Sequence, residues 1–303
     1  MLVGDGRGAG DFKATAVVVP DTPPHFIHST LTPEQTTFFK AQTGIDDDEA
    51  LKNHILQVQT RAYKVFPYPC IQLGTFLEHG MAALPVYDSV LKLGREHPDG
   101  IFLDIGACFG VDARKAAADG YPLGNIVTTD LYQEFFDLGH ELFRTTPASY
   151  PISFVAGDMF KPEMLQILPP LDGPPPTERP DLSTLTSLDP LAGHCVAIYA
   201  GNVFHLFSEE NQLRLAKGLA GLLSPVPDSV IFGMHASNLK KGVLHVEHGG
   251  KAVDGFCHSP ESWAAIWDGE VFDKGKVRVD ATLEWMDREG FAFWQMRWSV
   301  LRL

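Results

Sequence analysis

The chain has 303 residues, and 45% hydrophobic with 20% charged residues is the composition of a folded globular protein rather than a disordered one. Its 24 basic and 38 acidic side chains leave a formal net charge of −14, which repels nucleic acid and anionic membrane surfaces at long range. Four scattered cysteines without a C-x-x-C pair predict reduced thiols in the cytoplasm. We find neither a signal-peptide pattern nor an apolar run long enough to span a membrane.

The N-terminal third divides into a tail and a helical region. Residues 1–31 are predicted to be a flexible tail, because the glycines from Gly4 to Gly10 have no strand before them and no helix after them, as a phosphate loop would require. Residues 32–95 are predicted to form a helical cap, with Thr32 as an N-cap and Pro33 at the first helical position. The helices expected in this cap are 33–43, 47–65, 70–80 and 86–93.

Residues 96–303 alternate short apolar runs with amphipathic stretches, which predicts βαβ units and a mainly parallel sheet. The strands expected are 101–105, 126–129, 153–156, 195–199, 230–234, 276–285 and 291–301. The helices expected are 112–119, 133–143, 209–223 and 260–266. Residues 286–290 are too few for a crossover helix, so one of the last two strands must be antiparallel. The predicted fold is therefore α/β: a Rossmann-like, seven-stranded, mainly parallel sheet with a reversed terminal β-hairpin, plus the N-terminal helical cap.

A glycine turn follows the first predicted strand, in Gly106-Ala107-Cys108-Phe109-Gly110. Its glycines permit close backbone approach of a ligand, and the amides at the start of the next helix carry partial positive charge. A dinucleotide fingerprint would have glycine where Cys108 stands, and without it little room remains for a pyrophosphate. The turn therefore favours a nucleotide-like cofactor other than NAD.

Three aspartates stand at the ends of successive strands. Asp104 precedes the glycine turn, and Asp130 is placed to accept ribose hydroxyls. Asp158 is placed to accept from an adenine amine, with Met159 or Phe160 beside the ring. Each has a purely structural alternative: Asp104 as a turn cap, Asp130 as a helix N-cap and Asp158 as a turn residue. Their order at successive strand ends favours an adenosine site.

This pattern resembles the class I S-adenosylmethionine-dependent methyltransferases, over residues 100–303. The resemblance implies S-adenosyl-L-methionine as cofactor, although many members have glycine where this chain has Cys108. The cofactor-binding residues that it implies are Asp104, Gly106, Ala107, Cys108, Gly110, Asp130, Leu131, Asp158, Met159, Ala200 and Asn202.

A narrower resemblance rests on residues 202–208, 222–225 and 258–263, together with Tyr68-Pro69-Cys70-Ile71. These segments are similar to fungal secondary-metabolite methyltransferases, including those that esterify carboxyl groups of meroterpenoid intermediates. The resemblance implies transfer of a methyl group to a carboxylate or hydroxyl oxygen of a small molecule. The residues expected to contact that substrate are Tyr68, Phe204, Phe256 and Trp263.

Three histidines, His205, His235 and His258, lie at or just past predicted strand ends and are candidates for a catalytic base. The alternative is that they are hydrogen-bonded loop residues, because a carboxylate acceptor is already ionised at neutral pH and needs no base. Residues 236–259 contain several glycines and are predicted to be a movable loop that shapes the acceptor pocket with the cap.

We expect no metal site, because His245 and His248 lie in a glycine- and lysine-rich segment without the spacing of a zinc centre. The competing hypotheses are a nicotinamide-dependent oxidoreductase, a metallohydrolase and a non-catalytic methyltransferase-like binding module. The expected partner is a small-molecule substrate, with no nucleic acid and no membrane, and the expected state is a monomer or homodimer.

Overall fold

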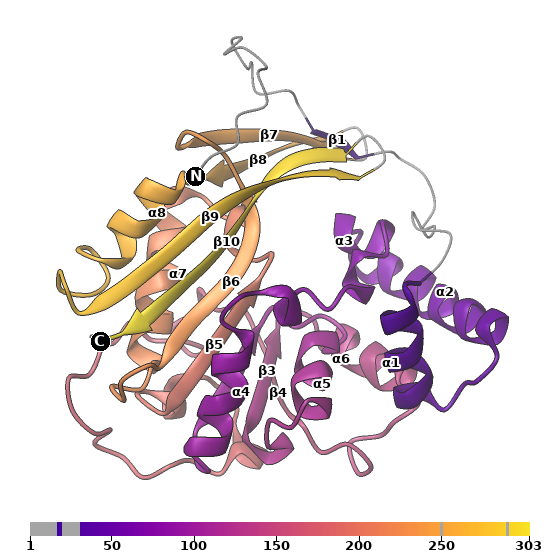
Figure 1. Ribbon diagram of the computed structural model, residues 1–303, viewed down its shortest axis with the longest axis horizontal. Helices are drawn as coiled ribbons and strands as arrows, with labels where there is room; N and C mark the ends of the chain where they lie inside the picture. Colours follow the sequence, from indigo (N-terminus) through magenta and orange to yellow (C-terminus); the bar gives the residue numbers. More distant parts are fainter. Residues whose placement is uncertain (1–16, 20–30, 249–250, 289–290) are drawn as a thin grey trace.

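A computed structural model describes residues 17–19, 31–248, 251–288 and 291–303. Its main element is a seven-stranded sheet in the order β4-β3-β2-β5-β6-β10-β9 (Figure 1). The strands are β2 Ile101–Ile105, β3 Ile126–Asp130, β4 Ser153–Ala156, β5 Cys195–Gly201, β6 Val230–Ser237, β9 Val277–Arg288 and β10 Phe291–Arg302. Strand β10 is antiparallel to both of its neighbours, whereas β2 to β6 pair in parallel. This confirms the predicted sheet with a reversed terminal hairpin.

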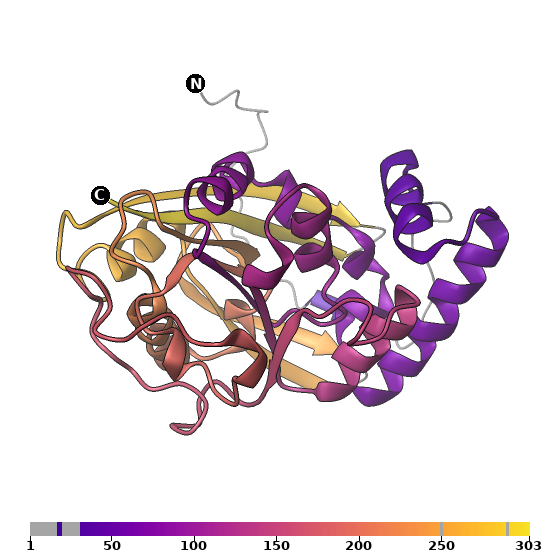
Figure 2. The ribbon, with the colours of Figure 1, turned by 90° about the horizontal axis from the view of Figure 1, so that it is seen from below.

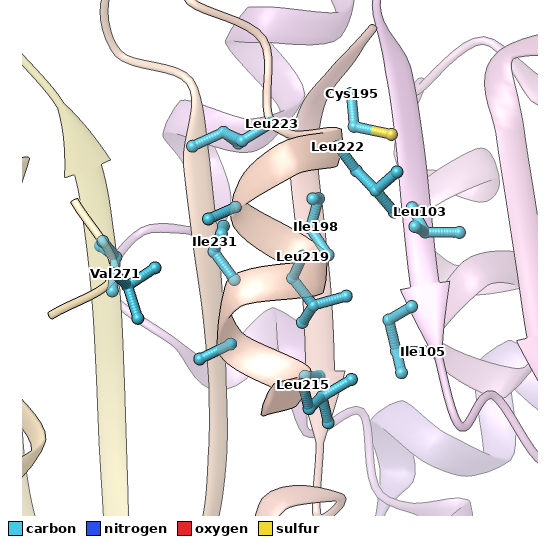
Figure 3. Close-up of a cluster of buried hydrophobic side chains, with 14 of the residues drawn as sticks. Leu103, Ile105, Cys195, Ile198, Leu215, Leu219, Leu222, Leu223, Ile231 and Val271 are labelled. Carbon is cyan, nitrogen blue, oxygen red and sulfur yellow. The ribbon is translucent and has the colours of Figure 1, made fainter. Parts of the chain in front are cut away.

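One face of the sheet is covered by α7 (Glu209–Leu222) and α8 (Pro260–Trp267). Leu215, Leu219 and Leu222 recur on one side of α7 at helical spacing and lie over β2, β5 and β6 (Figure 3). They are at most 1% exposed, and burying each leucine stabilises the fold by about 1.5 to 3 kcal/mol.

The opposite face is covered by α4 (Tyr87–Glu96) and α5 (Val111–Ala118). Val90 and Leu93 of α4 share one buried cluster with Phe102, Val196 and Phe232 of the sheet. The sequence pattern predicts α4 as the last helix of the cap, but α4 packs directly on the sheet and forms part of its hydrophobic core.

The remaining N-terminal helices, α1 (Pro33–Thr43), α2 (Asp48–Val65) and α3 (Pro69–Gln72), pack against α6 (Gln133–Leu142) in a third cluster. Figure 2 shows α1 and α2, in indigo, at the end of the molecule away from the C-terminus. The predicted helix over 70–80 is wrong: α3 ends early because Gly74 has a φ of 70°, and a 3₁₀ turn at Thr75–Leu77 follows. Buried Gln59 holds α3 to α2 by donating to the Ile71 and Gln72 carbonyls.

The segment predicted as a loop over 236–259 is mostly a β-hairpin, so that prediction is wrong. Strands β7 (Gly242–His248) and β8 (Lys251–Cys257) pair antiparallel, and β1 (Val17–Val19) pairs with β7. The signal that we missed is a pair of valine-containing runs separated by Gly249 and Gly250. Residues 1–16 and 20–30 of the predicted tail lie outside the described residues.

Across the part of the chain that the structure describes, we find no helix with the length and apolar character needed to cross a membrane.

Candidate active site

The glycine turn links β2 to α5 and has a strained, well-supported backbone. Gly106, Cys108 and Gly110 have φ values of 67°, 50° and 69°, a left-handed conformation that is costly only for the cysteine. The Gly106 and Ala107 amides donate to the Thr129 carbonyl at 2.8 and 3.0 Å. A Cβ atom on Gly106 would lie 2.7 Å from the Val203 side chain. Glycine is therefore required at position 106, and the turn is held close to β3 and β5.

Asp130 at the end of β3 supports this turn directly. Its Oδ2 accepts from the Cys108 amide at 2.9 Å, and its Oδ1 accepts from the Tyr132 amide at 3.2 Å. Burial raises the pKa of Asp130, and these backbone hydrogen bonds oppose the rise. The Leu131 amide is a third backbone donor to this carboxylate. A carboxylate offers about four lone-pair positions, so it can still accept from a ribose hydroxyl. Leu131, which follows, is 50% exposed and can cover a bound ring.

Asp104 is the most deeply buried acid of the site. It is 2% exposed, and its Oδ2 has no hydrogen-bond partner within the described structure. Burial raises its pKa well above the usual range, and the charges of Asp112 and Asp130 add to that rise. A cationic ligand group beside Oδ2 would compensate all of these unfavourable effects.

Asp112 is a functional candidate that the sequence analysis missed. Its Oδ1 accepts from the Met81 amide at 3.1 Å, and its side chain is hydrogen-bonded to the Tyr199 hydroxyl. Burial raises its pKa to about 6 despite these bonds. The only available sequence signal was an acidic residue in the first turn of the helix after Gly110. We call Asp104, Asp112 and Asp130 the aspartate group.

The other predicted cofactor residues lie in the loops after β4 and β5 or at the end of β5. Asp158 Oδ1 accepts from the Phe160 amide at 2.9 Å, which is the turn role considered as its alternative. Met159 packs against the main core, and Ala200 is buried in β5. The Asn202 amide donates to the Met234 carbonyl at 2.6 Å, and the residue itself is exposed with a φ of 56°. Because β2 to β5 are parallel, the predicted cofactor residues share one edge of the sheet.

The three candidate histidines come together although they are far apart in sequence. His205 follows β5, His235 lies on β6, and His258 follows β8. The Trp263 ring of α8 contacts two of them, with its centroid 4.8 Å from that of His235 and 5.6 Å from that of His258, and His205 lies close enough to His235 to influence its pKa. We call His205, His235, His258 and Trp263 the histidine–tryptophan cluster. Phe204 packs 4.9 Å from Trp263, and Phe256 packs 5.0 Å from His258.

Burial keeps this cluster uncharged. It lowers the pKa of His205 and of His258 to about 4, and it lowers the pKa of His235 well below the usual value. Repulsion from the other two rings, were they protonated, would lower the pKa of His235 further. Four buried nitrogens of the cluster have no partner among the described residues: His205 Nδ1, His235 Nε2, His258 Nε2 and Trp263 Nε1. Such atoms cost free energy unless a ligand or water satisfies them.

Tyr68 lies apart from the other predicted substrate residues. Its ring packs against Phe66 and Phe135, with centroids 4.4 and 6.0 Å away. Burial raises its pKa, and the next contribution is the charge of Asp130. Tyr68 therefore belongs to the side of the aspartate group, whereas Phe204, Phe256 and Trp263 gather around the histidines. His245 and His248 lie on β7, and their side chains fall outside the described ones.

The chain is similar to several known proteins. Residues 25–77 match the family described as the meroterpenoid methyltransferase N-terminal domain. The chain is 29% identical over 243 residues to O-methyltransferase phiE of a fungal species, covering 80% of this chain and 73% of that one. It is 29% identical over 232 residues to the Asnovolin E/Chermesin D methyltransferase nvfJ of Aspergillus novofumigatus, covering 75% and 73%. A solved structure of magnesium protoporphyrin IX methyltransferase from Synechocystis is 12% identical, with a TM-score of 0.45, covering 85% and 100%.

The strand order with its reversed β10, the acidic glycine turn and the sequence similarities define a class I S-adenosylmethionine-dependent methyltransferase. The same strand order disfavours a nicotinamide-dependent oxidoreductase, whose sheet continues in parallel at this edge. Within the class, the chain is similar to fungal methyltransferases, and the similarity extends into the N-terminal helices.

Proposed function

We propose that this protein transfers a methyl group from S-adenosylmethionine to an oxygen of a small secondary metabolite, with a carboxylate as the favoured acceptor. The observation that carries the cofactor half of this proposal is the buried, unpartnered Oδ2 of Asp104 beside the glycine turn. A buried carboxylate without a partner is unfavourable by itself and becomes favourable beside a cation. The cofactor carries both an ammonium and a sulfonium group.

Each predicted cofactor residue has a role that suits its position. Asp104 would hold the ammonium group, and the backbone from Gly106 to Gly110 would border the ligand. A remaining lone pair of Asp130 would accept from a ribose hydroxyl. Leu131, Asp158 and Met159 would surround the adenine, and Ala200 and Asn202 would lie beside the methionine part. When bound, the cofactor supplies a methyl group already activated for attack by an oxygen.

The histidine–tryptophan cluster favours a carboxylate over a phenol or alcohol. An effective base has a pKa near the working pH, whereas the pKa of His205 and of His258 is lowered to about 4. A carboxylate is ionised at neutral pH without any base. The neighbouring Phe204 and Phe256 provide apolar walls suited to a large carbon skeleton. The names of the similar proteins, an O-methyltransferase and a meroterpenoid-family domain, point in the same direction.

The division of the chain is also part of the proposal. Helices α1 to α3 act as the cap over the acceptor, whereas α4 packs on the sheet and belongs to its core. We retain the cytoplasmic location, the monomer or homodimer and the lack of a nucleic-acid partner as predictions based on the net charge of −14 and the reduced cysteines.

The direct test has two stages. Calorimetric titration of S-adenosylhomocysteine and NADH should show binding of the first only, and Asp104→Asn should reduce binding of S-adenosylmethionine by at least about tenfold. Incubation with S-adenosylmethionine and a panel of apolar carboxylic acids, phenols and amines should then give a one-methyl mass gain on an acid. Release of methanol from that product by alkali would identify it as an ester. Cofactor binding without transfer to any acceptor would instead favour the binding-module hypothesis.

A further inference from the structure

The protonation of His235 can be worked out from one hydrogen bond. The indole Nε1 of Trp298 lies 3.0 Å from His235 Nδ1, and both side chains are buried. An indole N–H can only donate, so Nδ1 must accept with its lone pair. A neutral imidazole has one donor and one acceptor nitrogen. The proton of His235 therefore lies on Nε2.

The Nε2–H group of His235 is buried and has no hydrogen-bond acceptor among the described residues. The same is true of the Nε1–H group of Trp263. The two rings are neighbours, with centroids 4.8 Å apart and their planes at 70°. Two unpartnered neutral donors in an aromatic environment match an oxygen that carries negative charge or a strong dipole. They do not match an ammonium group, which has no lone pair to offer.

The charged or titratable groups that act on His235 are His205, from the turn after β5, and His258, from the segment after β8. Both are themselves neutral at pH 7 because burial lowers the pKa of each to about 4. His235 is therefore held by Trp298 on one side and faces uncharged rings on the other. This differs from a catalytic base, which presents a lone pair to its substrate and is often oriented by a carboxylate.

We propose that His235 Nε2–H and Trp263 Nε1–H form a neutral donor pair that binds one oxygen of the acceptor's carboxylate, and that His235 is not a base. This inference rests on the proposed function and deepens it by naming the group that recognises the acceptor. The second carboxylate oxygen stays free to accept the methyl group. Because the only lone pair of the His235 ring is held by Trp298, a proton could be taken up only with loss of that hydrogen bond.

A pair of substitutions separates these roles. The amide nitrogen of His235→Gln can replace the Nε2 donor, whereas His235→Asn keeps an acceptor for Trp298 but lacks the donor. The probe is 2-naphthoate, titrated in the presence of S-adenosylhomocysteine and followed by the indole signals. We expect a Kd about tenfold or more higher in His235→Asn, the cost of one buried hydrogen bond to a charged group. His235→Gln should stay within about threefold of the parent. Equal Kd values in all three proteins would overturn the proposal.

The tautomer itself is measured without any acceptor. In protein labelled with ¹⁵N-histidine, with His235 assigned by the signals lost in His235→Gln, the shifts should show an unprotonated Nδ1 and a protonated Nε2 between pH 5 and 9. A proton on Nδ1, or titration of the ring near neutral pH, would overturn the proposal. Circular dichroism and S-adenosylhomocysteine binding confirm that the variants fold.

Turnover separates this inference from the proposed function. With an acid that the parent methylates, His235→Asn should raise KM while the pH profile of kcat stays unchanged. If both variants lose kcat and recover it at high pH, His235 is a base and the inference fails. If the parent methylates no acid, the proposed function fails, and the tautomer and naphthoate results still decide the role of His235.

Discussion

The aspartate group lies along β2, β3 and the start of α5, and the histidine–tryptophan cluster lies around β5, β6 and α8. Burial has opposite consequences for the pKa values of the two groups. It raises the pKa of Asp104, Asp112 and Asp130 and lowers the pKa of His205, His235 and His258. In both regions burial disfavours the charged form. The aspartates regain their charge at little cost when a cation arrives, whereas the histidines remain neutral donors and acceptors. One region is therefore suited to a cationic cofactor and the other to an acceptor bound without a countercharge.

The two regions should also respond oppositely to pH. A histidine whose pKa is lowered by folding contributes stability above its unfolded pKa, and that stability is lost as the pH falls towards the folded value. An aspartate whose pKa is raised contributes stability below its unfolded pKa, and that stability is lost as the pH rises through the folded value. Between about pH 4 and 6.5 the two effects oppose each other, so single substitutions can separate them.

The largest effect is expected for His258→Gln. With a folded pKa of about 4 against an ordinary 6.5, His258 should cost the parent about 3 kcal/mol of unfolding free energy between pH 6.5 and 4. The glutamine variant should lack this loss. Urea unfolding of the cofactor-free parent and variant at several pH values measures how the unfolding free energy of each protein depends on pH. Parallel curves for parent and variant would mean that His258 is not held neutral.

Asp112→Asn should have the opposite effect on how the unfolding free energy changes with pH, and the difference from the parent should be about 2 to 3 kcal/mol. The pKa of Asp112 is raised from 3.8 to about 6, so the parent should lose stability as the pH rises over this range. The asparagine oxygen can still accept from the Met81 amide, which keeps the local structure. The same urea series serves as the measurement, and a steeper loss in the variant than in the parent would contradict the assignment.

Gly139→Ala should destabilise the glycine turn, because Gly139 of α6 packs against the backbone of that turn. A Cβ atom at Gly139 of α6 would lie 2.5 Å from the carbonyl oxygen of Phe109, which is backbone and cannot move aside freely. Such overpacking costs about 1 to 3 kcal/mol, and cofactor affinity should fall with it. Gly124→Ala is the matched control, because no atom beyond its two chain neighbours would lie within 4 Å of the added Cβ. Thermal unfolding compares the two variants, and equal Tm values would refute the close packing.

Asp130→Ala should weaken S-adenosylmethionine binding by about 1 to 3 kcal/mol, because it removes an acceptor of the ribose hydroxyls and of the Cys108 amide. Asp137→Ala on the exposed side of α6 removes the same charge and should leave affinity unchanged. Calorimetric titration measures both. Unaltered affinity in Asp130→Ala would exclude the ribose role, and binding of NADH would contradict the class.

The smallest effect is expected in the pH dependence of turnover. With a carboxylate acceptor the rate should stay flat from about pH 6 to 8, and His205→Gln or His258→Gln should alter substrate binding without creating a need for base. With a phenol or alcohol acceptor, one of these substitutions should lower kcat by about 100-fold or more, with recovery at high pH. Steady-state profiles of each variant decide between the two acceptors.

The sequence alone determined the large sheet, because its parallel strands are short apolar runs bounded by glycine, proline or polar residues, and these signals are local. It also placed the aspartates at strand ends, since parallel strands must end at the same edge. The β7–β8 hairpin was missed because its two glycines indicated mobility as readily as a turn. Helix α4 was assigned to the cap because its sequence does not show which of two apolar surfaces it covers.

Tertiary structure alone decided how the side chains meet. His205, His235 and His258 come from three separate segments, and nothing in their spacing predicts that His235 and His258 both contact the Trp263 ring. The tautomer of His235 depends on Trp298, a residue 63 positions away across an antiparallel pair. Asp112 became a candidate only when burial and the Met81 and Tyr199 contacts were visible. Local sequence patterns specify backbone conformation, whereas the charge and proton positions of a site depend on burial and on partners that only the folded chain brings together.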